Sequence, residues 1–250
     1  NLIPSIIYED EHIIVINKPS GLVVNRAASV RENITVMDWI EGRTSIPFDK
    51  TSEFGMRFGV IHRLDKGTSG VMVIAKTREA FEKIQAQFKE RKVKKEYLGL
   101  VHADSFVNNL ESKFIIDAPI SRNPKNRLKW AVVEGGRNAV TEFNILDVYE
   151  FSAPSNKGRE KGKYVLLRCV PKTGRTHQIR VHLASINCPV VCDKVYLGRR
   201  TYKEDLKWCP RIFLHAERLG FKHPDMGEWV EYVAKLSKDL ESICKTIKKC

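Results

Sequence analysis

The sequence lacks the features that would place it in a membrane, in a disulfide-rich scaffold or around a metal ion. No apolar run in its 250 residues approaches the roughly 18 residues that span a bilayer. The N-terminal residues have no apolar core or small-residue cleavage site of a secretory signal. Six cysteines are scattered, and Cys188 and Cys192, near His182, have no second pair to complete a zinc site. We therefore expect a cytoplasmic protein with reduced thiols and no metal.

Acidic residues are the second shortage. The chain has 30 Asp and Glu against 43 Lys and Arg, which gives a net charge of +13 and an isoelectric point near 9.5. The basic excess gathers in a loop-like stretch from Arg122 to Arg137, in Lys157 to Lys163, and in a tail with Lys245, Lys248 and Lys249. Such an excess also fits a merely well-solvated surface, but three separate clusters favour a nucleic acid partner.

The chain has no internal repeat, and its turn residues separate short periodic segments. Alternating or buried apolar runs predict strands, and helical spacing of Phe81, Ile84 and Phe88 predicts the clearest helix. The expected elements are a hairpin over Ser5–Ile16, helices over Val36–Glu41, Thr77–Lys92 and His177–Ser185, strands over Val71–Ala75, Lys95–His102, Ala139–Tyr149 and Lys163–Val170, and a loop over Ser152–Gly162. Strands outnumber helices without strict alternation, which favours an α+β fold with a mixed or mainly antiparallel sheet.

One stretch concentrates charge where a buried strand begins. Ile61–Gly70 reads IHRLDKGTSG, and a hydrophobic run follows it directly. In an extended chain, residues two apart point the same way, so Arg63 and Asp65 can share a face. A core segment has no need of such charges at its entrance, whereas a catalytic loop does. A loop salt bridge is the structural alternative.

These residues resemble the signature loop of the RluA-type pseudouridine synthases, and other motifs of that family follow in order. The resemblance covers about residues 8 to 236. The matching segments are His62–Gly70, Asn17–Gly21, Lys95–Tyr97, Thr173–Leu183, Pro189–Asp193 and Leu214–Ala216. The chain departs from the pattern at Cys192, where glycine is common, and at Gly67, where many relatives carry aspartate.

The resemblance implies a fold and a domain organisation. It implies one catalytic domain over residues 1–250, built on a long bent mixed, mainly antiparallel sheet with flanking helices and loops and a central cleft. We expect no RNA-binding domain of the S4 type before Tyr8, where many relatives carry one.

Three catalytic residues follow from the same motifs. The resemblance implies that Asp65 is the essential nucleophile or base, that Arg175 pairs with it, and that Tyr97 is the active-site tyrosine. A guanidinium suits two-point contact with a carboxylate, and a tyrosine ring suits stacking on uracil. The alternatives are a phosphate-binding arginine at a helix start and a half-buried sheet tyrosine.

Three further residues are predicted to contact the substrate or support the site. Arg63 is implied to support the flipped-out nucleotide or to fill its place. Ile179 offers an apolar wall against the base, although it also fits a simple core position, and Lys18 is expected to brace the site. The histidines His62 and His177, like His182, are interpreted as hydrogen-bonding residues without a chemical role.

The sequence thus predicts an isomerase that converts specific uridines to pseudouridine in structured ribosomal or transfer RNA. The uridine must leave its stack to expose the reacting atoms, and Asp65 then opens the glycosidic bond. The resemblance implies no cofactor, and we expect a monomer without an obligate protein partner. The alternatives are a catalytically inactive RNA-binding protein and, less well supported, a phosphotransferase, because no phosphate-binding glycine-rich loop with its lysine is present.

Overall fold

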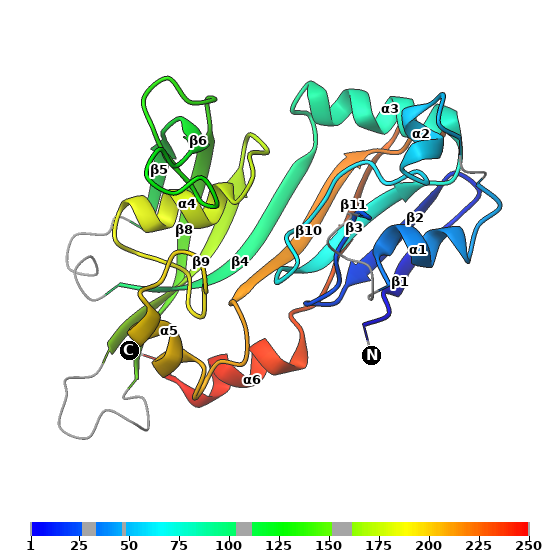
Figure 1. Ribbon diagram of the computed structural model, residues 1–250. Helices are drawn as coiled ribbons and strands as arrows, with labels where there is room; N and C mark the ends of the chain where they lie inside the picture. The colour runs from blue at the N-terminus through cyan, green and yellow to red at the C-terminus, as the bar shows by residue number, and fades with distance from the viewer. Residues whose placement is uncertain (1, 27–33, 47–48, 104–111, 152–161, 250) are drawn as a thin grey trace. The chain divides into compact units, whose positions relative to one another are not determined.

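The computed structural model describes residues 2–26, 34–46, 49–103, 112–151 and 162–249. They form two compact units (Figure 1). Unit 1 comprises Asn1–Lys95 and Ala216–Lys235, and unit 2 comprises Glu96–His215 and Leu236–Cys250. Two strands, β4 (Lys94–His102) and β10 (Leu214–Lys222), contain residues of both units. Within the described part of the chain, no helix combines the length and apolarity needed to cross a membrane.

Unit 1 is built on strands whose central members are almost entirely apolar. The strand order is β1 (Ser5–Glu9), β2 (Ile13–Lys18), β3 (Ser69–Ala75) and β10, and β11 (Trp229–Val233) also pairs with β10. All seven residues of β3 are buried, which explains its unbroken run of apolar and small residues. β2 lies antiparallel to both β1 and β3, and the consecutive strands β1 and β2 form a hairpin.

The described part of unit 1 also contains three helices. Helix α1 (Val36–Glu41) begins with a capping box between Thr35 and Asp38, and α2 (Glu53–Met56) is a single turn. Helix α3 (Arg78–Lys89) is capped by the Thr77 side chain and buries Phe81 and Ile84. The buried face of α3 therefore follows the helical spacing seen in the sequence.

Unit 2 contains the longest strands. Its order is β4, β9 (Gly162–Pro171), β8 (Val140–Phe151) and β12 (Lys248–Lys249), with β5 (Lys113–Asp117) also on β8. A separate two-stranded hairpin consists of β6 (Ile120–Arg122) and β7 (Trp130–Val132). Helix α4 (Gln178–Ser185) packs on β7, β8 and β9.

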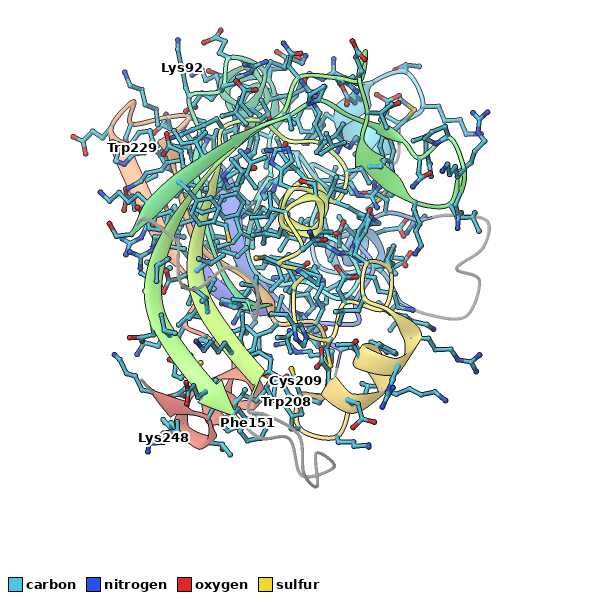
Figure 2. The ribbon with its side chains drawn as sticks, turned by 90° about the vertical axis from the view of Figure 1, so that its left-hand side faces the viewer. Lys92, Phe151, Trp208, Cys209, Trp229 and Lys248 are labelled. Carbon is cyan, nitrogen blue, oxygen red and sulfur yellow. The ribbon has the colours of Figure 1, made fainter. Side chains whose placement is uncertain are left out.

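Two more helices close the core of unit 2. Helix α6 (Lys238–Thr246) buries Leu240 and Ile243 against a cluster that includes Phe213. Helix α5 (Arg199–Asp205) is followed by Trp208, whose ring lies 5.1 Å from that of Phe151. Figure 2 shows Trp208 and Phe151 together at the end of β8, beside Cys209.

The structure confirms the α+β class and the mainly antiparallel sheet, because every strand pair with a described register is antiparallel. One prediction needs correction. The stretch from Arg122 to Arg137 is not only loop, since it contains β7 and the last residue of β6. The loop predicted over Ser152–Gly162 lies almost entirely outside the described residues. The single-domain organisation, the bend of the sheet and the central cleft stay predictions.

The start of β3 leaves no room for a side chain at Gly70. Its φ is +123°, and an added Cβ would lie 2.1 Å from the carbonyl oxygen of Ala216 on β10. We expect Gly70→Ala to lower the free energy of unfolding by about 3 kcal/mol or more, because backbone would have to move. Gly198→Ala is the control, because a Cβ there meets nothing within 4 Å. Urea denaturation of both variants checks this, and equal stabilities would contradict the described packing.

Candidate functional site

Asp65 lies in a turn that leads directly into β3. Its carbonyl oxygen accepts a hydrogen bond from the backbone N–H of Thr68, 3.1 Å away, and β3 begins one residue later. Leu64, which precedes it, is buried, whereas Asp65 is partly exposed and Arg63 is exposed. The apolar residue therefore anchors the turn, and the two charged residues on either side of it remain accessible.

A buried lysine braces this turn from the neighbouring motif. The Lys18 side chain is fully buried, and its Nζ donates to the carbonyl oxygens of Pro19 and Leu22, each at 2.9 Å, and of Lys66 at 3.4 Å. The Gly21 N–H donates to the same Lys66 carbonyl at 2.7 Å, and Ser20 Oγ donates to the Gly67 carbonyl at 2.7 Å. The turn Pro19–Gly21 is thus tied to the residues after Asp65. Lys18 is fully buried and braces this turn, while its predicted role toward a substrate stays a prediction.

His62, on the other side of the loop, is a structural residue. Its Nε2 accepts a hydrogen bond from the backbone N–H of Val73, and its ring stacks on Phe88 of α3 with centroids 4.8 Å apart. Burial lowers the pKa of His62 well below its ordinary value, and the charges of Lys95 and Arg57 add to this effect. Burial also lowers the pKa of Lys95 to about 8. A neutral imidazole that accepts a backbone hydrogen bond is the hydrogen-bonding role predicted for His62.

In unit 2, the turn before α4 holds Arg175. Gln178 organises this turn, since its Oε1 accepts from the Arg175 N–H at 2.9 Å and from Thr173 Oγ1 at 2.7 Å. The Gln178 amide nitrogen donates to the Val140 carbonyl at 3.0 Å. Arg175 Nε donates to the Asn138 carbonyl at 3.0 Å, which orients the guanidinium. One glutamine therefore fixes the backbone that presents Arg175.

The closing motif is joined to α4 by a buried ion pair. Arg180 Nε and Nη2 each lie 2.7 Å from one carboxylate oxygen of Asp193, and both side chains are almost fully buried. Cys192, just before Asp193, has a φ of 58°, a conformation that glycine adopts without strain. Here the Cys192 N–H donates to the buried carboxylate of Asp205 at 2.8 Å, which helps to hold the turn.

The other two predicted histidines also make structural hydrogen bonds. His177 Nδ1 lies 3.0 Å from the hydroxyl of Tyr196, which in turn accepts from the Trp130 N–H of β7 at 3.3 Å. His182 is buried between Thr141 Oγ1 at 2.9 Å and the Ala118 carbonyl at 3.0 Å. Burial lowers the pKa of His182. Tyr196 therefore ties the β6–β7 hairpin to the start of α4.

Tyr97 and Ile179 belong to one apolar cluster of unit 2. Tyr97 lies on β4 opposite Cys169 of β9 and is half-buried, and Ile179 is buried on α4. Both pack with Phe143 and Leu183, among other residues. The tyrosine ring therefore has firm apolar support on β4 and a part that remains exposed.

The predicted residues are divided between the units. Lys18, Arg63 and Asp65 belong to unit 1, and Tyr97, Arg175 and Ile179 belong to unit 2. Gln178, Asp193 and Tyr196 were not predicted as supporting residues. A signal existed for Gln178, a side chain able to bond the backbone at a helix start, and for Asp193, which ends the matching segment Pro189–Asp193. None marked Tyr196, whose partners are distant in sequence.

Comparison with known proteins identifies the family to which this chain belongs. A family model described as RNA pseudouridylate synthase matches residues 12–185. A ribosomal large subunit pseudouridine synthase D from Xanthomonas campestris is 36% identical over 98% of this chain and 69% of its own length. The chain belongs to the RNA pseudouridylate synthase family. This confirms the predicted family and its reaction class, isomerisation of uridine in RNA.

The chain is also similar to other pseudouridine synthases. A protein of the same description from Pseudomonas aeruginosa is 37% identical over 94% of this chain and 68% of its length. The solved structure of human RNA pseudouridylate synthase domain containing 1 covers 100% of this chain and 89% of that chain, with a TM-score of 0.71 and 26% identity. The chain spans between 61% and 73% of the lengths of such bacterial relatives.

The brace on the signature loop can be tested with a matched pair of variants. Lys18→Met keeps the apolar stem and removes the ammonium, which leaves buried carbonyl groups without that donor. We expect the free energy of unfolding to fall by about 2–4 kcal/mol. Lys50→Met, at an exposed lysine of the same unit, should change it by less than about 0.5 kcal/mol. Denaturant titrations compare the two, and an undiminished stability of Lys18→Met would show that the brace is dispensable.

Proposed function

We propose that this pseudouridine synthase modifies uridine in large-subunit ribosomal RNA. The observation that carries the proposal is the braced turn that holds the partly exposed residue Asp65 within a chain of this family. Several bacterial relatives are ribosomal large subunit pseudouridine synthases, which supports ribosomal RNA over transfer RNA. We further propose that the protein acts as a cytoplasmic monomer.

Asp65 is proposed as the group that opens the glycosidic bond. Attack at the sugar, attack at the base and removal of the 2′ proton all start from a carboxylate at this position. The N1–C1′ bond breaks, uracil turns, C5 bonds to C1′, and the C5 proton leaves as N1 gains one. The exposure of Arg63 beside Asp65 suits its proposed role at the flipped-out nucleotide.

Arg175 is proposed as the partner of Asp65 and Tyr97 as the ring that holds the uracil. Two features of unit 2 support these roles. The Gln178 hydrogen bonds fix the turn of Arg175, and apolar packing fixes Tyr97 on β4. Ile179, from the same cluster, is proposed to back the ring rather than to react. A pre-organised arginine can form two-point hydrogen bonds to a carboxylate with little loss of side-chain freedom.

The β6–β7 hairpin is proposed as an RNA contact. Arg122 stacks over the Trp130 ring at 4.6 Å and donates to the Arg127 carbonyl at 2.9 Å. Lys125 is exposed on the same hairpin, and Lys129 is partly exposed. Exposed cations on a short rigid arm suit a phosphate backbone. The C-terminal cluster is less available, since Lys245 pairs with Glu241 at 2.7 Å and Lys249 pairs with Asp147.

Asp65→Asn separates the enzyme from the alternative of an inactive RNA-binding protein. The substitution keeps the size of the side chain and removes the carboxylate. We expect pseudouridine formation in a purified assay to fall by at least about three orders of magnitude, with RNA affinity within about threefold of wild type. The assay uses transcribed large-subunit ribosomal RNA and, in parallel, a transfer RNA pool. Full activity of Asp65→Asn, or no activity of the wild type on either RNA, would contradict the proposal.

Tyr97 has two proposed contributions that substitution can separate. Tyr97→Phe keeps the stacking face and removes only the hydroxyl, so we expect near-normal RNA binding with slowed turnover. Tyr97→Ala removes both, and stacking on a base contributes about 1–3 kcal/mol, so binding should weaken as well. Affinity and single-turnover rates measure the two effects. Circular dichroism must first show intact folding, because alanine leaves a cavity in the cluster. A well-folded Tyr97→Ala with wild-type rate and affinity would remove Tyr97 from the site.

A further inference from the structure

A strip of unpaired cations runs along α5 and the turn before it. Lys194, Arg199, Arg200 and Lys203 are all exposed. Among the described residues, none of these four side chains forms an ion pair or a hydrogen bond. Several other cations of unit 2 do form ion pairs with acidic residues. The contrasting pairs are Lys172–Glu142 at 2.8 Å, Lys207–Glu204 at 2.8 Å, Arg211–Asp239 at 2.6 Å and Lys245–Glu241 at 2.7 Å.

The stability of α5 does not account for this strip. Arg199 and Lys203 are four residues apart, and Arg200 and Lys203 are three apart, so like charges meet on the helix surface. Two arginines also occupy the first turn, where the helix dipole disfavours cations, and that turn contains no acidic residue. The helix has no side-chain cap. Each feature slightly opposes folding, and a polyanion that contacts the strip would relieve the charge repulsion.

The strip is held rigidly despite its unfavourable charges. Asp205, the last residue of α5, is buried and lies 2.9 Å from His102 Nε2 of β4. The same carboxylate accepts the Cys192 N–H, and the Leu197 N–H donates to the Asp193 carbonyl at 3.0 Å. The backbone that carries the cations is therefore fixed, so binding needs to order only their side chains.

The strip also has a defined place relative to Arg175 within unit 2. Lys194 directly follows Asp193, whose carboxylate clamps Arg180 on α4. In both figures α4 lies between the β6–β7 hairpin above and α5 below. The basic hairpin and the strip thus lie on either side of the helix that begins just after Arg175.

We propose that the strip is a docking surface for the RNA phosphate backbone beyond the target uridine. This inference rests on the proposed function and adds a second contact to it. RNA then touches unit 2 at the hairpin and at α5, with the helix that follows Arg175 between them. The contacts are electrostatic and sequence-independent, so they favour RNA long enough to reach both places.

The test compares two variants with the same change of charge. The strip variant carries Arg199→Gln, Arg200→Gln and Lys203→Gln, and it leaves Lys194 unchanged because that residue adjoins Asp193. The control carries Lys92→Gln, Lys172→Gln and Lys245→Gln, at exposed lysines that pair with acidic residues. Both variants must match the melting temperature of the wild type within a few degrees. Ribosomal RNA fragments of increasing length, centred on the uridine that the wild type modifies, serve as probes.

We expect the strip variant to bind the longest fragment about tenfold more weakly at low salt, with a slope of log affinity against log salt that is shallower by about 2. On the shortest fragment it should match the wild type. The control should match the wild type throughout. Wild-type affinity and slope in the strip variant, an equal loss in the control, or an equal loss at every length would each overturn the inference. Pseudouridine formation by the wild type tests the proposed function separately.

Discussion

The signature loop depends on a buried ammonium group. Lys18 lies at the end of β2, and its Nζ bonds carbonyl oxygens on both its own turn and the turn of Asp65. An unpaired buried cation would cost several kcal/mol, so this arrangement is stable only when the carbonyl groups converge on it. The need of the buried ammonium for these carbonyl groups therefore holds the turn of Asp65 against the turn that follows Lys18. Gly70 adds a second constraint, since only a residue without Cβ lets β3 approach Ala216 so closely.

Unit 2 supports its functional residues in a similar way, with a buried bidentate ion pair in place of the lysine. Arg180 and Asp193 join α4 to the closing motif, and Asp205 holds the strained turn at Cys192. Gln178, on the same helix as Arg180, then fixes the turn of Arg175 by accepting a hydrogen bond from its backbone N–H. In both units a side chain that we propose to react or to contact the substrate is partly exposed, while the residue that fixes its backbone is buried. Such separation lets the supporting contacts stay intact when the exposed group meets RNA.

Much of the fold could be predicted because local patterns were strong. The helix over Val36–Glu41 has its capping residue and periodic apolar face within a few positions, and the buried strand of Val71–Ala75 is one apolar run. Elements without such patterns were missed. Helix α5 buries Asp205 rather than an apolar stripe, and in β11 exposed and half-buried residues alternate, with none fully buried. The partner of Asp205 is His102 of β4, which is 103 residues away, so no local signal marks α5. β11 pairs with the nearby β10, but its lack of fully buried residues leaves no apolar run that would predict it.

The sequence by itself determined the family, the order of its motifs and the residue types that perform the chemistry, because these depend on short segments such as His62–Gly70. It also determined the basic character that suits RNA. Only the tertiary structure decided which residues support that chemistry. Lys18, Gln178 and Asp193 act through partners that the folded chain brings to them, and burial gives those contacts their strength. It also decided which cations are neutralised by acidic neighbours and which, as on α5, are left for a partner.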